Sequence, residues 1–215
     1  MSRPAVSAAG LVQRFGRQVA LRGVDLQVEA GERLVILGDN GAGKSTLLRL
    51  LATVARPTSG ELKLFGLDAL RQRSALRRRI GWLAHQTGLY PALTVLENLE
   101  FFCTLHGLSR SRAAECLDLL GVGADAGRPA GQLSRGRQQR LALARSLLHD
   151  PELWVLDEPD SSLDAGGRRL LATLAGDRTV VAATHDRDLA AALGARTLTL
   201  REGRVLERPA LEVVN

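Results

Sequence analysis

Polar and apolar residues alternate near the start of the chain, and short blocks of continuous apolar residues follow further along. Val24, Leu26 and Val28 alternate with polar residues, and a Glu-Ala-Gly-Glu turn leads into the run at 33–37. A period of two is typical of strands with one buried face, so this part is predicted to form antiparallel strands. A later apolar run that ends at Asp157 predicts a buried strand.

Segments with a helical period lie between the strands. Apolar residues at 47, 48, 51 and 54 recur at three- and four-residue spacing and predict a helix, which Pro57 and Gly60 stop. Further helices are predicted within 93–133, over about 136–148, and before a strand at 179–184. The last part of the pattern, 197–206, predicts a hairpin that turns at Glu202-Gly203.

Strands that alternate with helices imply an α/β fold with a mostly parallel sheet covered on both faces. The helical middle of the chain, about 93–145, is then a lobe inserted into this core. No window supplies the roughly 20 predominantly apolar residues of a membrane-spanning helix, and the N-terminus lacks a secretory pattern. The protein is therefore expected to be made and kept in the cytosol.

A glycine-rich loop between a predicted strand and a predicted helix carries the clearest chemistry. It matches the pattern G-x-x-x-x-G-K-[ST] throughout. Glycines let backbone N–H groups converge on phosphate oxygens, and the N-terminus of the next helix adds a partial positive charge. Lys44 is expected to reach the β- and γ-phosphates of a nucleoside triphosphate, and the Ser45 hydroxyl to ligate Mg²⁺. The predicted nucleotide-binding residues of this loop are Gly38, Asp39, Asn40, Gly41, Ala42, Gly43, Lys44, Ser45 and Thr46.

Polar residues end three apolar strands farther along the chain. Asp157 and Glu158 follow one strand, and Gln86 and His185 each follow another. Ligands of open parallel sheets bind beyond the carboxyl ends of the strands, so these side chains are expected to converge with Ser45. Asp157 is the predicted metal-side acid, Glu158 the general base and His185 a contact of the γ-phosphate.

Read together, these segments resemble the nucleotide-binding domain of an ABC transporter, and the resemblance covers nearly all of residues 1–215. The most diagnostic stretch, Leu133-Ser-Arg-Gly-Arg-Gln-Gln-Arg140, is similar to the Leu-Ser-Gly-Gly-Gln signature of that family. The resemblance implies one P-loop NTPase domain of ABC type, with a mostly parallel core, an antiparallel β-subdomain and the inserted helical lobe. It also implies that ATP and Mg²⁺ bridge two like subunits in a head-to-tail homodimer.

The resemblance assigns further residues by position. Gln86 resembles the Q-loop residue and His185 the switch histidine, while Phe15 matches the aromatic residue that stacks on adenine. The expected catalytic residues are Glu158, His185, Gln86 and Lys44, and the expected Mg²⁺ ligands are Ser45, Gln86 and Asp157. Contacts to the nucleotide of the other subunit are expected from Ser134, Arg135, Gly136, Arg137 and, in the D-loop, Asp164. Arg135 and Arg137 depart from the family's Gly and Gln, which leaves the turnover rate open.

The expected partners are integral-membrane permease subunits, with the ATPase at the cytoplasmic face of the membrane. The segment 87–99 resembles the groove that receives a coupling helix of the permease. The stretches at 81–86 and 97–107 look like the haem-exporter ATPase of c-type cytochrome biogenesis. ATPases of drug, polysaccharide and lipid exporters share these features, and a permease-free ATPase such as that of iron–sulfur cluster assembly stays open.

Charge and cysteine content change this picture little. The net charge is +6, and only Lys44 and Lys63 among the 29 basic residues are lysine. The basic residues are scattered apart from one arginine cluster at 71–79, so a nucleic-acid partner is not expected. Cys103 and Cys116 have neither metal-ligand nor redox spacing and are expected to be reduced, buried apolar residues.

Overall fold

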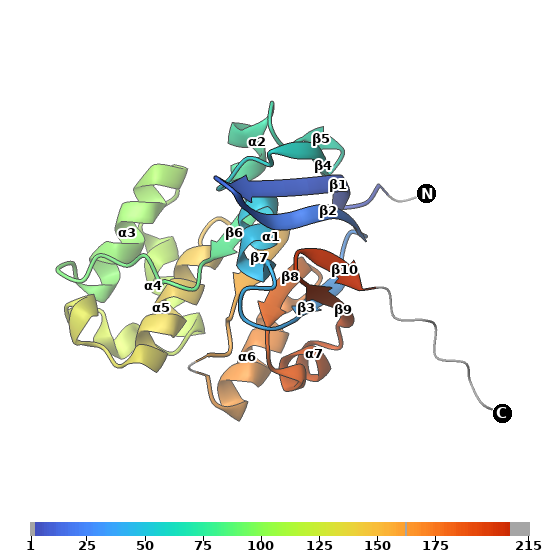
Figure 1. Cartoon of the computed structure of the whole chain (residues 1–215). Coiled ribbons are helices and arrows are strands. Elements are labelled where there is room, and N and C mark those ends of the chain that lie inside the picture. Colours follow the sequence, from blue (N-terminus) through green and yellow to red (C-terminus); the bar gives the residue numbers. More distant parts are fainter. Residues whose placement is uncertain (1–2, 162, 207–215) are drawn as a thin grey trace.

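An antiparallel sheet forms one side of the molecule, for which the computed structural model describes residues 3–161 and 163–206 (Figure 1). Its strands are β1 (Val6–Phe15), β2 (Gln18–Val28), β4 (Ser59–Leu64) and β5 (Leu67–Asp68), in the order β2-β1-β4-β5. Val24, Val28 and Leu26 on β2 point into the core, as their alternation predicts.

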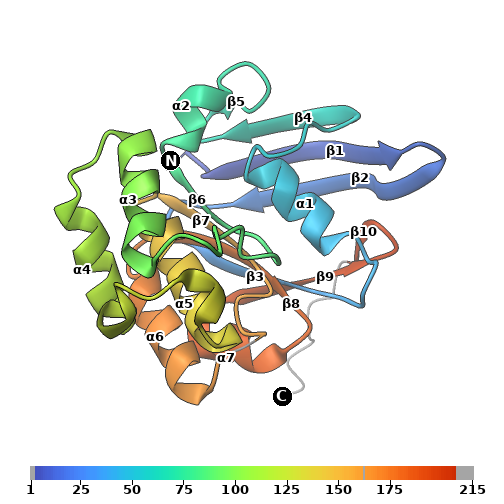
Figure 2. The ribbon, with the colours of Figure 1, turned by 90° about the vertical axis from the view of Figure 1, so that its left-hand side faces the viewer.

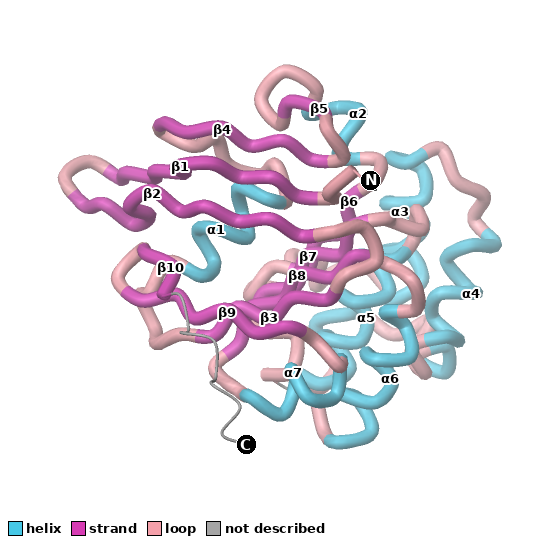
Figure 3. The backbone as a smooth tube through the Cα atoms, turned by 90° about the vertical axis from the view of Figure 1, so that its right-hand side faces the viewer, coloured by secondary structure: helices cyan, strands magenta, loops and turns pink. Residues whose placement is uncertain are grey.

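A second, six-stranded sheet forms the centre of the fold. Its strands are β3 (Arg33–Leu37), β6 (Ile80–Leu83), β7 (Leu153–Asp157), β8 (Thr179–Thr184), β9 (Arg196–Arg201) and β10 (Arg204–Leu206). The order is β10-β9-β3-β8-β7-β6, and every pairing is parallel except that of β9 with β10. The tube view separates this sheet from the antiparallel one (Figure 3). The predicted fold class and the hairpin turning at Glu202-Gly203 are both confirmed.

Helix α1 (Lys44–Leu51) lies between the two sheets (Figure 2). Leu47, Leu48 and Leu51 are fully buried there, as their spacing predicts. Val54 was predicted as the fourth residue of this buried face, but it is 44% exposed, so this part of the prediction is wrong. The helix ends at Leu51, and Thr53 takes a left-handed backbone conformation that turns the chain before Val54.

The other helices lie on the opposite face of the six-stranded sheet, and those between β6 and β7 make up the segment predicted as the helical lobe. The helices on this face are α3 (Val95–His106), α4 (Ser111–Leu119), α5 (Arg135–Leu147), α6 (Ala165–Ala175) and α7 (Arg187–Leu193). The short helix α2 (Arg73–Arg77) precedes β6, and two 3₁₀ turns, Gly123–Asp125 and Ala130–Gln132, join α4 to α5. No helix in the described ranges is both long and apolar enough to cross a membrane.

The side chains of the central strands divide between two cores. On β7, Trp154 and Leu156 pack with the helices, while Leu153 and Val155 pack with α1 and the antiparallel sheet. Because successive side chains of a strand point to opposite faces, a continuous apolar run fills both cores at once. Burial on both faces holds the carboxyl end of β7, where the acidic pair follows, in a fixed position.

The predicted state of the cysteines is confirmed, whereas the arginine cluster is partly structural. Cys103 and Cys116 are free and fully buried. Arg73 and Arg77 donate to the Thr53 carbonyl oxygen at the end of α1. Arg79 makes two hydrogen bonds to Glu152, at 2.5 and 2.6 Å. Much of the positive charge at 71–79 therefore holds the fold together.

Candidate nucleotide-binding site

An open cleft of about 1300 Å³ lies where the phosphate loop meets the β1–β2 hairpin and the carboxyl ends of β7 and β8. Phe15, Lys44, Glu158 and His185 are among the residues that line it. The Phe15 side chain lines the cleft and is 53% exposed, so a base can reach it. Residues 17–20 and Arg22 also line the cleft, although the sequence pattern did not single them out.

The phosphate loop has the backbone conformation for which its glycines are needed. Gly43, at the start of α1, has a φ of 104°, in the left-handed region. A Cβ atom at Gly43 would lie 2.7 Å from the carbonyl oxygen of Ala20. Only glycine fits both the backbone angle and this close approach of β2, so the loop wraps tightly around the start of the helix.

Lys44 is held inside the loop by backbone oxygens. Its Nζ donates to the carbonyl oxygens of Gly38, at 2.6 Å, and Asp39, at 3.2 Å. The same nitrogen lies 3.8 Å from Oε1 of Glu158. The ammonium group thus stands between the phosphate loop and the carboxylate after β7.

Ser45 and Asp157 form the second contact between these segments. The Ser45 hydroxyl donates to Oδ1 of Asp157 at 3.0 Å, and Asp157 is only 3% exposed. Burial raises the pKa of the Asp157 carboxyl above its ordinary value, and the hydrogen bond from Ser45 opposes this shift. A hydroxyl and a carboxylate side by side are hard oxygen donors of the kind that Mg²⁺ prefers.

Glu158 has a strained backbone at the centre of the site. Its φ is 50°, in the left-handed region that residues with a Cβ rarely adopt. Its backbone N–H donates to the carbonyl oxygen of Ala183 at 2.8 Å, and its Oε2 lies 2.9 Å from Nδ1 of His185. Such strain persists only where neighbouring structure imposes it, and it concentrates at functional sites.

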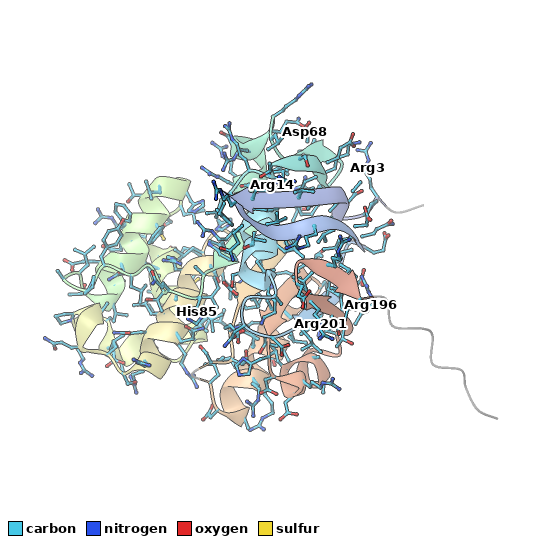
Figure 4. The ribbon with its side chains drawn as sticks, in the orientation of Figure 1. Arg3, Arg14, Asp68, His85, Arg196 and Arg201 are labelled. Atoms are coloured by element: carbon cyan, nitrogen blue, oxygen red, sulfur yellow. The ribbon has the colours of Figure 1, made fainter. Side chains whose placement is uncertain are left out.

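Gln86 lies in the loop after β6, directly after His85. The strand β6 ends at Leu83, and Gln86 is exposed in the loop that follows and does not line the cleft. His85 lines the cleft in its place and is labelled in Figure 4 beside the helical lobe.

The predicted trans residues lie apart from the cleft of their own chain. The Ser134 hydroxyl accepts the N–H of Arg137 and caps α5. Arg137 and Arg128 both pair with Asp125, whereas Arg135 is exposed and Gly136 is half-buried.

Asp164 caps helix α6, since its Oδ1 accepts the N–H of Gly167 at 2.7 Å. Like the four residues of the signature, Asp164 does not line the cleft.

Two buried polar residues at the site had no signal in the sequence pattern. Gln139 of α5 donates through Nε2 to the carbonyl oxygen of Pro159 at 3.2 Å, directly after Glu158. Asp160 accepts a hydrogen bond from the hydroxyl of Thr184 at 3.1 Å. The two contacts join residues that are 20 and 24 positions apart, which no local pattern predicts.

Comparison with known proteins agrees with this geometry. The profile of the family described as ABC transporter matches residues 21–161, which is well over half of the chain. The chain belongs to the ABC transporter family. It is the ATPase component, with the ABC-type P-loop NTPase fold.

Individual relatives and structures support the assignment. The chain is 42% identical over 187 residues to the cytochrome c biogenesis ATP-binding export protein CcmA of Salmonella typhi, covering 85% of this chain and 90% of that protein. It is 36% identical over 203 residues to the ABC transporter ATP-binding protein NatA of Bacillus subtilis, covering 90% and 82%. A dimeric post-hydrolysis structure of the ATP-binding cassette MJ0796 with ADP and Pi aligns at a TM-score of 0.87 and 32% identity, covering 96% and 99%.

Proposed function

We propose that this ABC ATPase binds ATP with Mg²⁺ in the cleft, hydrolyses it with Glu158 as general base, and drives a separate membrane permease. The observation that supports this most directly is the carboxylate of Glu158, held between Lys44 at 3.8 Å and His185 at 2.9 Å. A carboxylate at the carboxyl end of a parallel strand, beside a phosphate loop, is placed to polarise an attacking water.

The roles of the other residues follow from their positions around the cleft. The phosphate loop and Lys44 bind the β- and γ-phosphates, and Phe15 stacks on the adenine ring. His185 contacts the γ-phosphate from the edge of β8. Gln86 acts from the loop after β6, next to His85, which lines the cleft.

The oxygen donors present fit a magnesium ion. Ser45 and Asp157 would hold it, with Gln86 as the third predicted protein ligand. No group of three or more His, Cys, Asp or Glu side chains in the described part of the chain has metal-binding geometry, which suits an ion that keeps several water and phosphate ligands. When bound, Mg²⁺ would neutralise charge on the β- and γ-phosphates.

We propose that two chains form a head-to-tail homodimer on ATP. The five predicted trans residues, which include Ser134 and Asp164, do not line their own cleft, so a second copy is needed to use them. A helix N-terminus with its serine cap suits a γ-phosphate. The MJ0796 cassette, which is similar over 96% of this chain, is a dimer in both structures compared.

The permease contact is proposed for the aromatic surface around α3. Tyr90 and Phe101 are 46% and 40% exposed, with ring centroids 5.2 Å apart, and Phe102 packs edge-on against Phe101. Tyr90 lies within the segment 87–99 that resembles a coupling-helix groove, and Phe101 and Phe102 follow this segment on α3. An apolar surface of this kind marks a protein contact.

For the substrate, we propose haem export for c-type cytochrome maturation, based on the similarity to the cytochrome c biogenesis export protein over 90% of its length. A drug exporter is the second candidate, because a daunorubicin resistance ATP-binding protein of Streptomyces coeruleorubidus is 38% identical over 216 residues. Affinity purification from detergent-solubilised host membranes distinguishes them by the permease recovered. A preparation free of any multi-span partner would favour a permease-free ATPase.

The catalytic assignment is tested with Glu158→Gln and Lys44→Ala. Removing the base should lower ATP turnover by at least about a hundredfold while ATP binding persists, and Glu158→Gln should accumulate as an ATP-bound dimer in size-exclusion chromatography. Lys44→Ala should weaken ATP binding itself. The matched control is Glu152→Gln, whose carboxylate pairs with Arg79 far from the cleft. Turnover of Glu158→Gln at the rate of this control would contradict the role of Glu158.

A further inference from the structure

Asp160 is a buried carboxylate beside the site to which the proposed mechanism gives no role. It is 8% exposed and lies two positions after Glu158. Its Oδ2 accepts a hydrogen bond from the Thr184 hydroxyl at 3.1 Å. Its Oδ1 is buried and has no hydrogen-bond partner among the described residues. Burying a carboxylate is costly, so a group of this kind needs a reason to be there.

The partner of Asp160 controls the backbone on both sides of His185. Thr184, the last residue of β8, is fully buried, and its Oγ1 accepts the backbone N–H of Asp186 at 3.0 Å. A hydroxyl has one proton to donate and lone pairs to accept with. Because Asp160 takes the proton, the lone pairs of Thr184 are oriented toward the N–H of Asp186. The residues before and after His185 are thereby tied together.

His185 has little else to hold it. Its side chain is 71% exposed, and its contact with Glu158 is the hydrogen bond described for it. An exposed side chain keeps one position only if its backbone is fixed. Glu158 is fixed to the same strand through its N–H to Ala183, so both ends of the Glu158–His185 contact depend on the segments that Asp160 and Thr184 join.

We propose that Asp160 is a positioning residue, which orients the turn carrying His185 toward Glu158 through the hydroxyl of Thr184. This inference rests on the proposed roles of Glu158 and His185 in hydrolysis. Asp160 is not among the residues that line the cleft. Its removal should lower the rate of the chemical step and leave nucleotide affinity nearly unchanged, because the phosphate loop is not involved.

The test compares variants on each side of the hydrogen bond by steady-state ATPase kinetics. Asp160→Ala removes the acceptor, and Thr184→Val removes the hydroxyl while keeping the shape. Each should lower kcat by about ten- to a hundredfold, with KM for ATP changed less than about twofold, as for a misplaced catalytic group. Thr184→Ser keeps the hydroxyl and should retain kcat within about threefold. A melting curve for each variant checks that it is folded, and Thr184→Val replaces Asp160→Ala if the latter does not fold.

A double-mutant comparison separates positioning from a general structural role. In a His185→Ala background, Asp160→Ala should cause no further loss of kcat, because the residue through which it acts is gone. An equal additional loss in that background would overturn the inference. So would a normal kcat in Asp160→Ala and Thr184→Val while Glu158→Gln and His185→Ala turn over measurably but far more slowly than the wild type, and in that case the proposed function stands. Normal turnover in Glu158→Gln or His185→Ala would instead refute the site assignment itself.

Discussion

The loop between β6 and α3 depends on a single buried amide, which gives a test of how the helical lobe is built. Asn98 of α3 is fully buried. Its Oδ1 accepts the backbone N–H of Tyr90 at 2.8 Å. Its Nδ2 lies 3.0, 3.2 and 2.9 Å from the carbonyl oxygens of Tyr90, Leu93 and Thr94. We expect Asn98→Ala to destabilise the fold and to free this loop.

The size of the effect follows from counting which groups lose their partners. The amide has two protons, so it makes two independent donated bonds and one accepted bond. The three carbonyl oxygens keep other donors, which are the N–H groups of Leu93, Ala130 and Asn98 itself. Three bonds at about 1 kcal/mol each give a loss of about 3 kcal/mol in the free energy of unfolding. The backbone N–H of Tyr90, by contrast, loses the partner described for it, which is Oδ1 of Asn98.

Urea denaturation followed by circular dichroism measures this loss. With an m-value of about 3 kcal/mol/M, the midpoint should fall by about 1 M. Thr104→Ala is the control on the same helix, because its exposed hydroxyl donates to the Glu100 carbonyl oxygen, and it should change stability by less than about 0.5 kcal/mol. Asn98→Asp keeps the acceptor but sets a carboxylate oxygen against carbonyl oxygens, so it should cost more than Asn98→Ala. A midpoint for Asn98→Ala equal to that of Thr104→Ala would refute the reasoning.

Two further predictions concern stability. The buried Trp154 Nε1–H donates to the Ser146 hydroxyl at 2.8 Å, and Ser146→Ala removes this acceptor. The free energy of unfolding, measured by heat or urea, should fall by about 1–3 kcal/mol. An unchanged stability would mean that the indole N–H finds another partner. The imidazole rings of His106 and His149 are stacked, with their centroids 4.3 Å apart. Burial lowers the pKa of both side chains below the ordinary 6.5. The unfolded chain therefore takes up protons first, so stability is retained above about pH 6.5 and falls as the pH drops below it. His149→Gln should reduce the loss of folding stability between pH 7 and 5.5. An equal loss in the variant and the wild type would contradict the attribution of this pH dependence to the histidine pair.

Local patterns were enough to locate several of the strands, the final turn and the phosphate loop. The run 179–184 and the turn at Glu202-Gly203 were predicted at their observed positions, because side-chain period and turn chemistry act over a few residues. The phosphate loop was equally readable, since its glycines are required by the conformation of the loop itself. Acidic residues directly after an apolar strand also marked the carboxyl edge of the sheet.

Positions at the ends of elements were less predictable. Val54 fits the helical spacing of α1 but lies beyond its end, where the left-handed Thr53 redirects the chain. Gln86 follows an apolar strand as His185 does, yet only His185 contacts Glu158. The spacing of residues does not say how a loop leaves its strand, because that depends on what the loop packs against.

The fold class, the phosphate loop and the strands and helices around the acidic pair could be predicted from the residues alone. The position of β3 between β8 and β9, the bonds from Asn98 to the loop after β6, and the bond between Asp160 and Thr184 follow from the packing of the whole chain. The physical reason is the range of the forces involved. Periodicity and turn preferences are properties of neighbouring residues, whereas a buried hydrogen bond forms between whichever groups the packing of the whole chain brings together.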